Sequence, residues 1–136
     1  MFVGRFEHQL DPKGRVVLPS AFRERLAAGG FISQGLDGCL SIWTSDEFEK
    51  EAREMVERVK RGEIDRNAAR ALSANSFPVK PDAQGRIQVP PVLRQYAGLS
   101  DRVVVIGAFT SIELWDADTW ERVDAAGGQI LSGSQN

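Results

Sequence analysis

One polar turn occurs twice in this chain, and that repetition limits how the chain can fold. The segment DPKGRVVLP at residues 11–19 returns 71 residues later as DAQGRIQVP at residues 82–90. Five residues recur at this spacing: Asp11, Gly14, Arg15, Pro19 and Arg23 return as Asp82, Gly85, Arg86, Pro90 and Arg94. After a shift of one residue, CLSIWTSDEFE also aligns with SIELWDADTWE. Similarity over this length indicates a duplicated supersecondary unit.

Both copies predict the same order of elements. The first predicts a strand at 2–10, a tight turn at 12–14 closing a hairpin with a strand at 15–18, a short helix from 20 that ends at Gly29 and Gly30, and strands at 31–34 and 39–43. The second predicts a hairpin around 82–86, a short helix at 91–97, and strands at 103–106 and 112–115. In the strand at 2–10, alternation places Phe2, Phe6 and Leu10 on one face.

Helices are predicted between and after the two copies. Apolar residues recur at helical spacing beyond residue 45, where Ser45 or Asp46 would cap a helix that stops at Gly62. The rest of that helix is charged at i,i+4 spacing, which fits either a solvated face or an oligomer edge. A second helix is predicted at 65–74 and a third at about 118–126, and the residues beyond it look like a loose tail.

Each copy alone has too few strands to close a core. Two copies can complete one sheet or barrel between them, and they should then pack as a pseudo-twofold pair. We therefore expect an α+β fold with four parts: a first repeat at 1–50, connecting helices at 51–75, a second repeat at 76–124 and a flexible tail at 125–136.

Enzymatic and metal-binding classes find little support in the sequence. The chain has one histidine, His8, and one cysteine, Cys39, which are too few for a metal cluster. Nothing near His8 suggests a serine and an acid arranged for nucleophilic catalysis, and no phosphate-loop pattern of glycines occurs. We expect no catalytic activity, no metal, no cofactor and no small-molecule substrate.

Charge and hydropathy restrict the location and the partners. No apolar stretch reaches the roughly 18 residues that a membrane span needs, and the first residues lack the layout of a signal peptide. We expect a cytoplasmic protein without membrane contact. A net charge of −2 argues against a broadly basic nucleic-acid binder, but residues 1–27 carry a local charge of +2. Any anion must therefore bind at one end of the molecule.

The repeated turn concentrates a cation at its tip in the first copy only. Asp11 and Arg15 flank the turn and could bridge its base, which would make Arg15 a structural staple. Lys13 has no acidic neighbour at the tip, and Gln84 replaces it in the second copy. Arginine and lysine on a two-stranded ribbon can also enter the major groove of DNA, where arginine pairs with guanine. Both interpretations of Arg15 remain open on these residues.

Three segments carry a resemblance to a known family: MFVGRFEHQLDPKGRVVLPSAFRERL, DAQGRIQVPPVLRQYAGL and ELWDADTW. Together they resemble MraZ, the bacterial regulators of the division and cell-wall gene cluster, over residues 1–124. The resemblance implies a double-split β-barrel of two SpoVT-AbrB-like repeats with peripheral helices and a ring-shaped homo-oligomer. It also implies binding of double-stranded DNA at short, G-rich direct repeats upstream of the chain's own operon. A nucleoid-associated repressor without catalytic activity is then expected.

In the family, the first Asp-x-x-x-Arg motif is the one associated with DNA, and here it spans Asp11 to Arg15. Lys13, Gly14 and Arg15 are accordingly expected to contact DNA. The flanking bases that we expect to clamp phosphates are Arg5 and Arg23. The residues expected to hold the shape of the two turns are Asp11, Asp82, Gly85 and Arg86.

Two other classes compete with DNA-dependent repression. One is a non-catalytic oligomeric scaffold whose ring holds a protein partner while Arg15 only pins the turn. The other is an AbrB-like antitoxin, which the short polar tail disfavours because it offers little to wrap a toxin. Whether the second turn meets DNA or a neighbouring subunit stays open.

Overall fold

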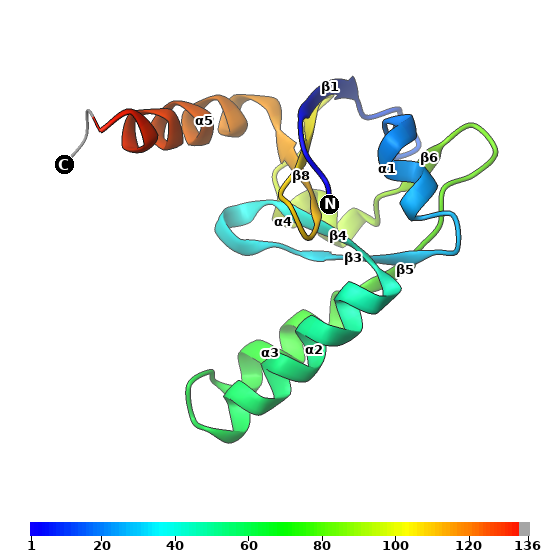
Figure 1. The fold of residues 1–136 in the computed structure, drawn as a ribbon. Helices are drawn as coiled ribbons and strands as arrows, with labels where there is room; N and C mark the ends of the chain where they lie inside the picture. Colours follow the sequence, from blue (N-terminus) through cyan, green and yellow to red (C-terminus); the bar gives the residue numbers. More distant parts are fainter. Residues whose placement is uncertain (134–136) are drawn as a thin grey trace.

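The computed structural model describes residues 1–133 and has an α+β fold, as expected (Figure 1). The first repeat contains β1 (Arg5–Gln9), β2 (Arg15–Val17), α1 (Ser20–Arg25), β3 (Gly30–Gln34), the 3-10 turn η1 (Leu36–Gly38) and β4 (Leu40–Thr44). The second contains β5 (Phe77–Val79), β6 (Arg86–Gln88), α4 (Pro91–Tyr96), β7 (Arg102–Gly107) and β8 (Ile112–Asp116). The helices α2 (Ser45–Lys60) and α3 (Arg66–Ala74) connect the repeats, and α5 (Ala117–Ser132) follows them.

The two repeats are joined by four strand pairs, β1-β7, β3-β5, β4-β8 and β2-β6, while β3-β4 and β7-β8 pair within a repeat. One sheet has six strands in the order β1-β7-β8-β4-β3-β5, and the other is the two-stranded ribbon β2-β6. β1 pairs with β7 just as its repeat mate β5 pairs with β3, and β4 pairs with its own mate β8. When every strand is replaced by its mate in the other repeat, the same strand order results, read from the opposite edge of the sheet. This confirms the pseudo-twofold packing, and within residues 1–133 the hydrogen-bonded pairs form these two sheets without closing into one barrel.

The predicted hairpin between residues 2–10 and 15–18 is wrong in its strand pairing. The turn itself forms, because Asp11 N donates to Arg15 O at 2.9 Å and Gly14 N donates to Asp11 O at 2.9 Å. Beyond it the two strands separate, and β1 joins β7 while β2 joins β6. Each strand then covers part of a core that both repeats share, which a local hairpin could not build alone.

The core lies between the ribbon and the large sheet. It is made of buried aliphatic and aromatic side chains from both repeats, and a fully buried side chain of this size contributes roughly 1.5–3 kcal/mol. Its largest members with almost no exposed surface are Phe2, Leu18, Leu26, Ile32, Leu40, Ile42, Ile87, Leu93, Ile112 and Leu114. Because the inner face of the ribbon belongs to this core, its outer face is held in a fixed place.

The first strand is shorter than predicted, and the apolar residues of its predicted inner face are buried to different extents. Phe2 and Phe6 both contact the ring of Phe22, and Leu10 packs against the same core. Phe2 is 1% exposed, whereas Phe6 is 37% exposed and meets the ring of Phe22 edge-on at 5.3 Å. Gly4 lies between them with φ at +98°, outside the extended region. The pairing with β7 begins only after that glycine, at Arg5, which is why the strand is shorter than predicted.

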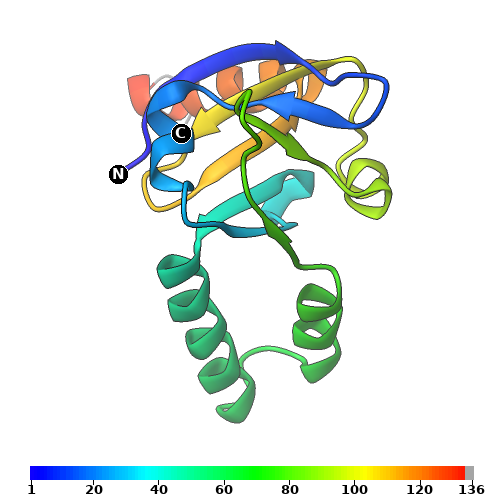
Figure 2. The same ribbon diagram turned by 90° about the vertical axis from the view of Figure 1, so that its right-hand side faces the viewer.

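The connecting helices form a hairpin that projects from the sheet (Figures 1 and 2). The cap of α2 is Thr44 and not Ser45 or Asp46 as predicted, because its hydroxyl accepts a hydrogen bond from Glu47 N at 3.3 Å. Gly62 follows the helix with φ at +75°, as expected for a stop. Asp65 caps α3.

The expected loose tail is wrong over residues 127–132, because α5 continues to Ser132. Two glycines at 127–128 suggested an end, but they stay helical, and the left-handed residue that stops α5 is Gly133 with φ at +75°. Figure 1 shows α5 leading away from the body of the molecule. Residues 134–136 of that tail lie outside the described residues.

Candidate functional site

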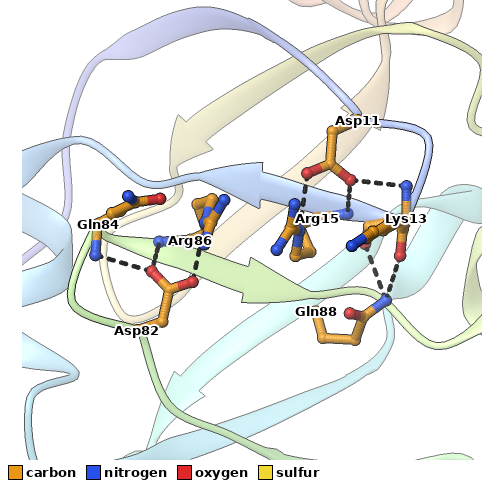
Figure 3. Close-up of polar contacts among 8 residues, drawn as sticks. Asp11, Lys13, Arg15, Asp82, Gln84, Arg86 and Gln88 are labelled. Carbon is orange, nitrogen blue, oxygen red and sulfur yellow. Dashed lines mark hydrogen bonds and ion pairs between the residues drawn. The ribbon is translucent and has the colours of Figure 1, made fainter.

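The ribbon of β2 and β6 has one apolar face and one polar face. Val16 and Ile87 pair at its centre and are each 1% exposed, since they point into the core. The residues on either side of them alternate outward, and these are Arg15, Val17, Arg86 and Gln88. The two repeated turns lie at opposite ends of this ribbon (Figure 3).

In the first turn, Asp11 holds both ends of the loop. Its Oδ1 accepts hydrogen bonds from Lys13 N and Arg15 N, each at 2.9 Å, and its Oδ2 accepts one from Arg15 Nε at 2.8 Å (Figure 3). These bonds, the one from the Arg15 backbone above all, lower the pKa of Asp11. Gly14 has φ at +79°, the left-handed conformation that glycine adopts without strain.

The second turn is built in the same way. Asp82 Oδ1 accepts from Gln84 N and Arg86 N at 2.9 Å, and Oδ2 accepts from Arg86 Nε at 2.8 Å. The backbone bond from Arg86 is again the first cause of a lowered pKa of Asp82, and Gly85 has φ at +78°. Identical bonding in both copies means that each Asp–Arg pair fixes the shape of its turn.

Arg15 combines this structural bond with an available edge. Its Nε donates to Asp11 Oδ2, and 27% of its side-chain surface is exposed. Within residues 1–133 the structure shows no hydrogen bond to either Nη atom of Arg15. A guanidinium has five donors in a fixed plane, so that edge can donate to a second acceptor while the turn stays intact.

The tips of the two turns differ in charge. Lys13 is exposed, and no ion pair of this lysine occurs in the part of the chain that the structure describes. Gln84 occupies the same place in the second turn and is neutral. The first end of the ribbon therefore presents an ammonium group and a guanidinium edge together.

The structure separates the two predicted phosphate clamps from the first turn. Arg5 forms a 2.7 Å ion pair with Asp124 of α5 and lies 5.7 Å from the centroid of Trp120. Arg23, from α1, donates to Gln84 O at 3.3 Å, so it lies against the second turn. A Cβ built on Gly85 would lie 2.0 Å from Arg23 Nη1.

Two residues near the first turn were missed by sequence reasoning. Arg94 of α4 covers Gly14, since a Cβ built there would lie 2.9 Å from Arg94 Cζ. Gln88 donates from Nε2 to Lys13 O at 2.7 Å. The repeat alignment identifies Arg94 as the mate of Arg23 but does not place it at this turn, and only the strand pairing brings Gln88 there.

In the part of the chain that the structure describes, the cysteine, the histidine and the potential metal ligands form no second site. Burial, and then the nearby Glu113, raises the pKa of Cys39 to about 12, so this thiol is unreactive at neutral pH. Partial burial lowers the pKa of His8. Among residues 1–133, no three potential metal ligands come together, and none of the helices has the length and apolar character to cross a bilayer.

Comparison with known proteins agrees with the repeat architecture. The family described as "MraZ protein, putative antitoxin-like" matches residues 1–70 and 72–127. A Cutibacterium acnes protein named "Transcriptional regulator MraZ" is 40% identical over 126 residues, covering 93% of this chain and 89% of that protein. A Saccharopolyspora erythraea protein of the same name is 43% identical over 121 residues, covering 89% and 85%. The chain therefore belongs to the MraZ family.

Proposed function

We propose that this chain is a transcriptional regulator that binds double-stranded DNA through the first end of the ribbon. The observation that carries the proposal is the pairing of exposed Lys13 with the open Nη edge of Arg15 on an outward, rigidly backed β-ribbon. A two-stranded ribbon fits the major groove, where arginine binds guanine O6 and N7 and lysine binds guanine or phosphate. The names of the two relatives support the same reading.

The finer proposal is repression from short direct repeats upstream of the chain's own operon, by a ring-shaped homo-oligomer. One ribbon end offers few positive charges, so several copies on repeated sites would supply affinity through avidity. Exposed apolar side chains such as Phe109, 64% exposed, and Leu131, 91% exposed, are available to neighbouring subunits. The protein would then act in the cytoplasm on the nucleoid, without catalysis.

The contacts follow from the geometry of the turn. Lys13, Gly14 and Arg15 would face the bases and the adjacent phosphates, and Asp11 would hold them in place. Arg5 and Arg23 each bond a protein partner through Nη1, and their remaining donors would add phosphate contacts at the edges. The repeats at 1–50 and 76–124 supply the two halves of the ribbon, and the helices at 51–75 stay outside it.

Direct measurement of DNA affinity tests the proposal. Fluorescence anisotropy with a duplex from upstream of the chain's own operon, against a scrambled duplex, should show specific binding that weakens with salt, because bound phosphates release counterions. Arg15→Ala should lower the specific affinity by about tenfold or more, the effect of losing one bidentate base contact. Arg86→Ala is the matched control, since it breaks the same staple in the second turn.

A scaffold that binds a protein partner is the alternative. Arg15 and Arg86 make the same bond to the aspartate of their turns. This favours the scaffold, because an arginine that only shapes its turn is needed equally in both repeats. If both alanine variants bind the operator like the unmodified chain while the oligomer elutes unchanged, the DNA-binding assignment is wrong. Persistent failure of the unmodified chain to bind at low salt would favour the scaffold.

A further inference from the structure

The Lys13 turn is held from outside by a side chain of the other repeat. Gln88 reaches across from β6, and its Nε2 donates to Lys13 O at 2.7 Å and lies 3.4 Å from Gly14 O (Figure 3). Gly14 O also accepts from Val89 N at 2.8 Å. The first turn is therefore fastened to the second repeat by its backbone carbonyls.

The second turn keeps the backbone part of this fastening, since Gly85 O accepts from Leu18 N at 2.9 Å. It lacks the side-chain amide. At the position of the first repeat that corresponds to Gln88 stands Val17, which has no donor. The carbonyl of Gln84, which corresponds to that of Lys13, instead accepts a longer bond of 3.3 Å from Arg23. The difference between the turns thus extends beyond the tip residue to the group that holds its carbonyl.

The arginine that corresponds to Arg23 does not take over this role in the first turn. Arg94 lies over Gly14, and its Nε is buried without a hydrogen-bond partner in residues 1–133. The carbonyl of Lys13 is bonded by the neutral amide of Gln88. The amide therefore occupies the place that a guanidinium occupies at the other end of the ribbon.

The consequence is a backbone fixed on both sides of the lysine side chain. Lys13 N donates to Asp11 Oδ1 at 2.9 Å, and Lys13 O accepts from Gln88 at 2.7 Å. A fixed peptide sets the direction in which the Cα–Cβ bond leaves the turn, so the backbone here has little conformational freedom left to lose on binding.

We propose that Gln88 is a positioning residue for DNA binding, which aims Lys13 at a phosphate by holding its carbonyl. This proposal rests on the proposed function, because it assigns Gln88 a role in the same site. It makes the second repeat a necessary part of the first repeat's contact, in addition to its part in the core.

Substitution of the amide by a side chain of similar length tests the proposal. Gln88→Met keeps the net charge and removes the donor, so operator affinity should fall by about three- to tenfold, the usual effect of one hydrogen bond. The slope of log affinity against log salt should also fall, toward the loss of about 0.9 expected for one phosphate contact. A neutral side chain that touched DNA directly would leave the slope unchanged.

A double-mutant cycle then asks whether Gln88 acts through Lys13. In the Lys13→Gln background, Gln88→Met should change the affinity by less than about twofold, because the group that it positions is gone. An equal drop in both backgrounds would overturn the proposal, and so would an unchanged affinity of Gln88→Met alone. The matched control is Val17→Met, which places the same residue at the corresponding position of the other repeat and should bind normally.

The outcomes separate this proposal from the function on which it rests. If the unmodified chain fails to bind the operator, the proposed function is wrong. If Lys13→Gln and Arg15→Ala weaken binding while Gln88→Met does not, only the role of Gln88 is wrong. Thermal unfolding and gel filtration should be used to check that each variant is folded. Gln88→Val, which copies the residue of the first repeat, is a second variant and should weaken binding in the same way.

Discussion

The two turns of the ribbon have the same internal bonds but different tips and outside contacts. Asp11 and Asp82 accept the same three hydrogen bonds at the same distances. The first turn adds Lys13 at its tip and Gln88 behind its carbonyl, whereas the second has Gln84 and a longer bond from Arg23. The shared bonds explain the repeated sequence, and the differences indicate where DNA recognition should lie.

The aspartates should give the largest effects on stability and test whether the shape is equally important in both turns. Asp11→Ala and Asp82→Ala each remove three hydrogen bonds that fix a turn, so each should lower the free energy of unfolding. Urea denaturation measures this change. Only Asp11→Ala should also weaken operator binding strongly, and equal weakening by Asp82→Ala would break the distinction between the turns.

The turn glycines should give the next largest effect. Gly14→Ala and Gly85→Ala each force a residue with a Cβ into positive φ and should cost about 1–2 kcal/mol. In both cases the new Cβ displaces a guanidinium, that of Arg94 or of Arg23. Thermal unfolding should report similar losses for the pair, and anisotropy should report weaker DNA binding for Gly14→Ala alone. A normal affinity of folded Gly14→Ala would contradict the role of this turn.

Removal of the tip lysine should have a moderate effect on binding and almost none on folding. Lys13→Gln, which copies the residue of the second turn, should lower the salt slope of operator binding by about 0.9, because one phosphate contact is lost. Gln84→Ala is the control at the other tip and should leave both the slope and the affinity unchanged. A slope that stays constant in Lys13→Gln would remove this lysine from the DNA contacts.

The acid dependence of stability should show the smallest effect. The folded-state pKa values of Asp11 and Asp82 are lowered, so their contribution is complete above the ordinary aspartate pKa and is lost as the pH falls through the folded values. The drop in melting temperature between neutral pH and about pH 3 should be smaller in Asp82→Asn than in the unmodified chain. Asp11→Asn should behave alike, and an unchanged drop in either would show that the staple does not depend on charge.

The sequence repeat predicted the helices and strands better than it predicted which strands pair with each other. Residue types near each strand and turn are local information, and most helices and strands lie close to their predicted ranges, with α5 and β1 as exceptions. The pairing of β2 with β6 depends on burying a shared core, which no local pattern reports, so a hairpin was expected where the strands separate. The cap at Thr44 was available in the sequence, because Glu47 follows it at capping-box spacing.

The candidate site could also be predicted from local sequence but not where it depends on strand pairing. Asp11, Gly14 and Arg15 stand out because they are repeated, and Lys13 stands out because it is not. Gln88 has no such signal, since its partner is 75 residues away and is reached only across the ribbon. Arg5 and Arg23 were assigned from charge alone, and the structure gives each of them another protein partner.

The most direct test exchanges the two tip residues and keeps the total charge constant. The double variant Lys13→Gln, Gln84→Lys is compared with Lys13→Gln and with the unmodified chain by operator binding at several salt concentrations. The account predicts that the double variant binds as weakly as Lys13→Gln, because a lysine on the second turn lacks the hold that Gln88 gives the first. Recovery of the original affinity and salt slope would contradict it, since the two ends of the ribbon would then be equivalent.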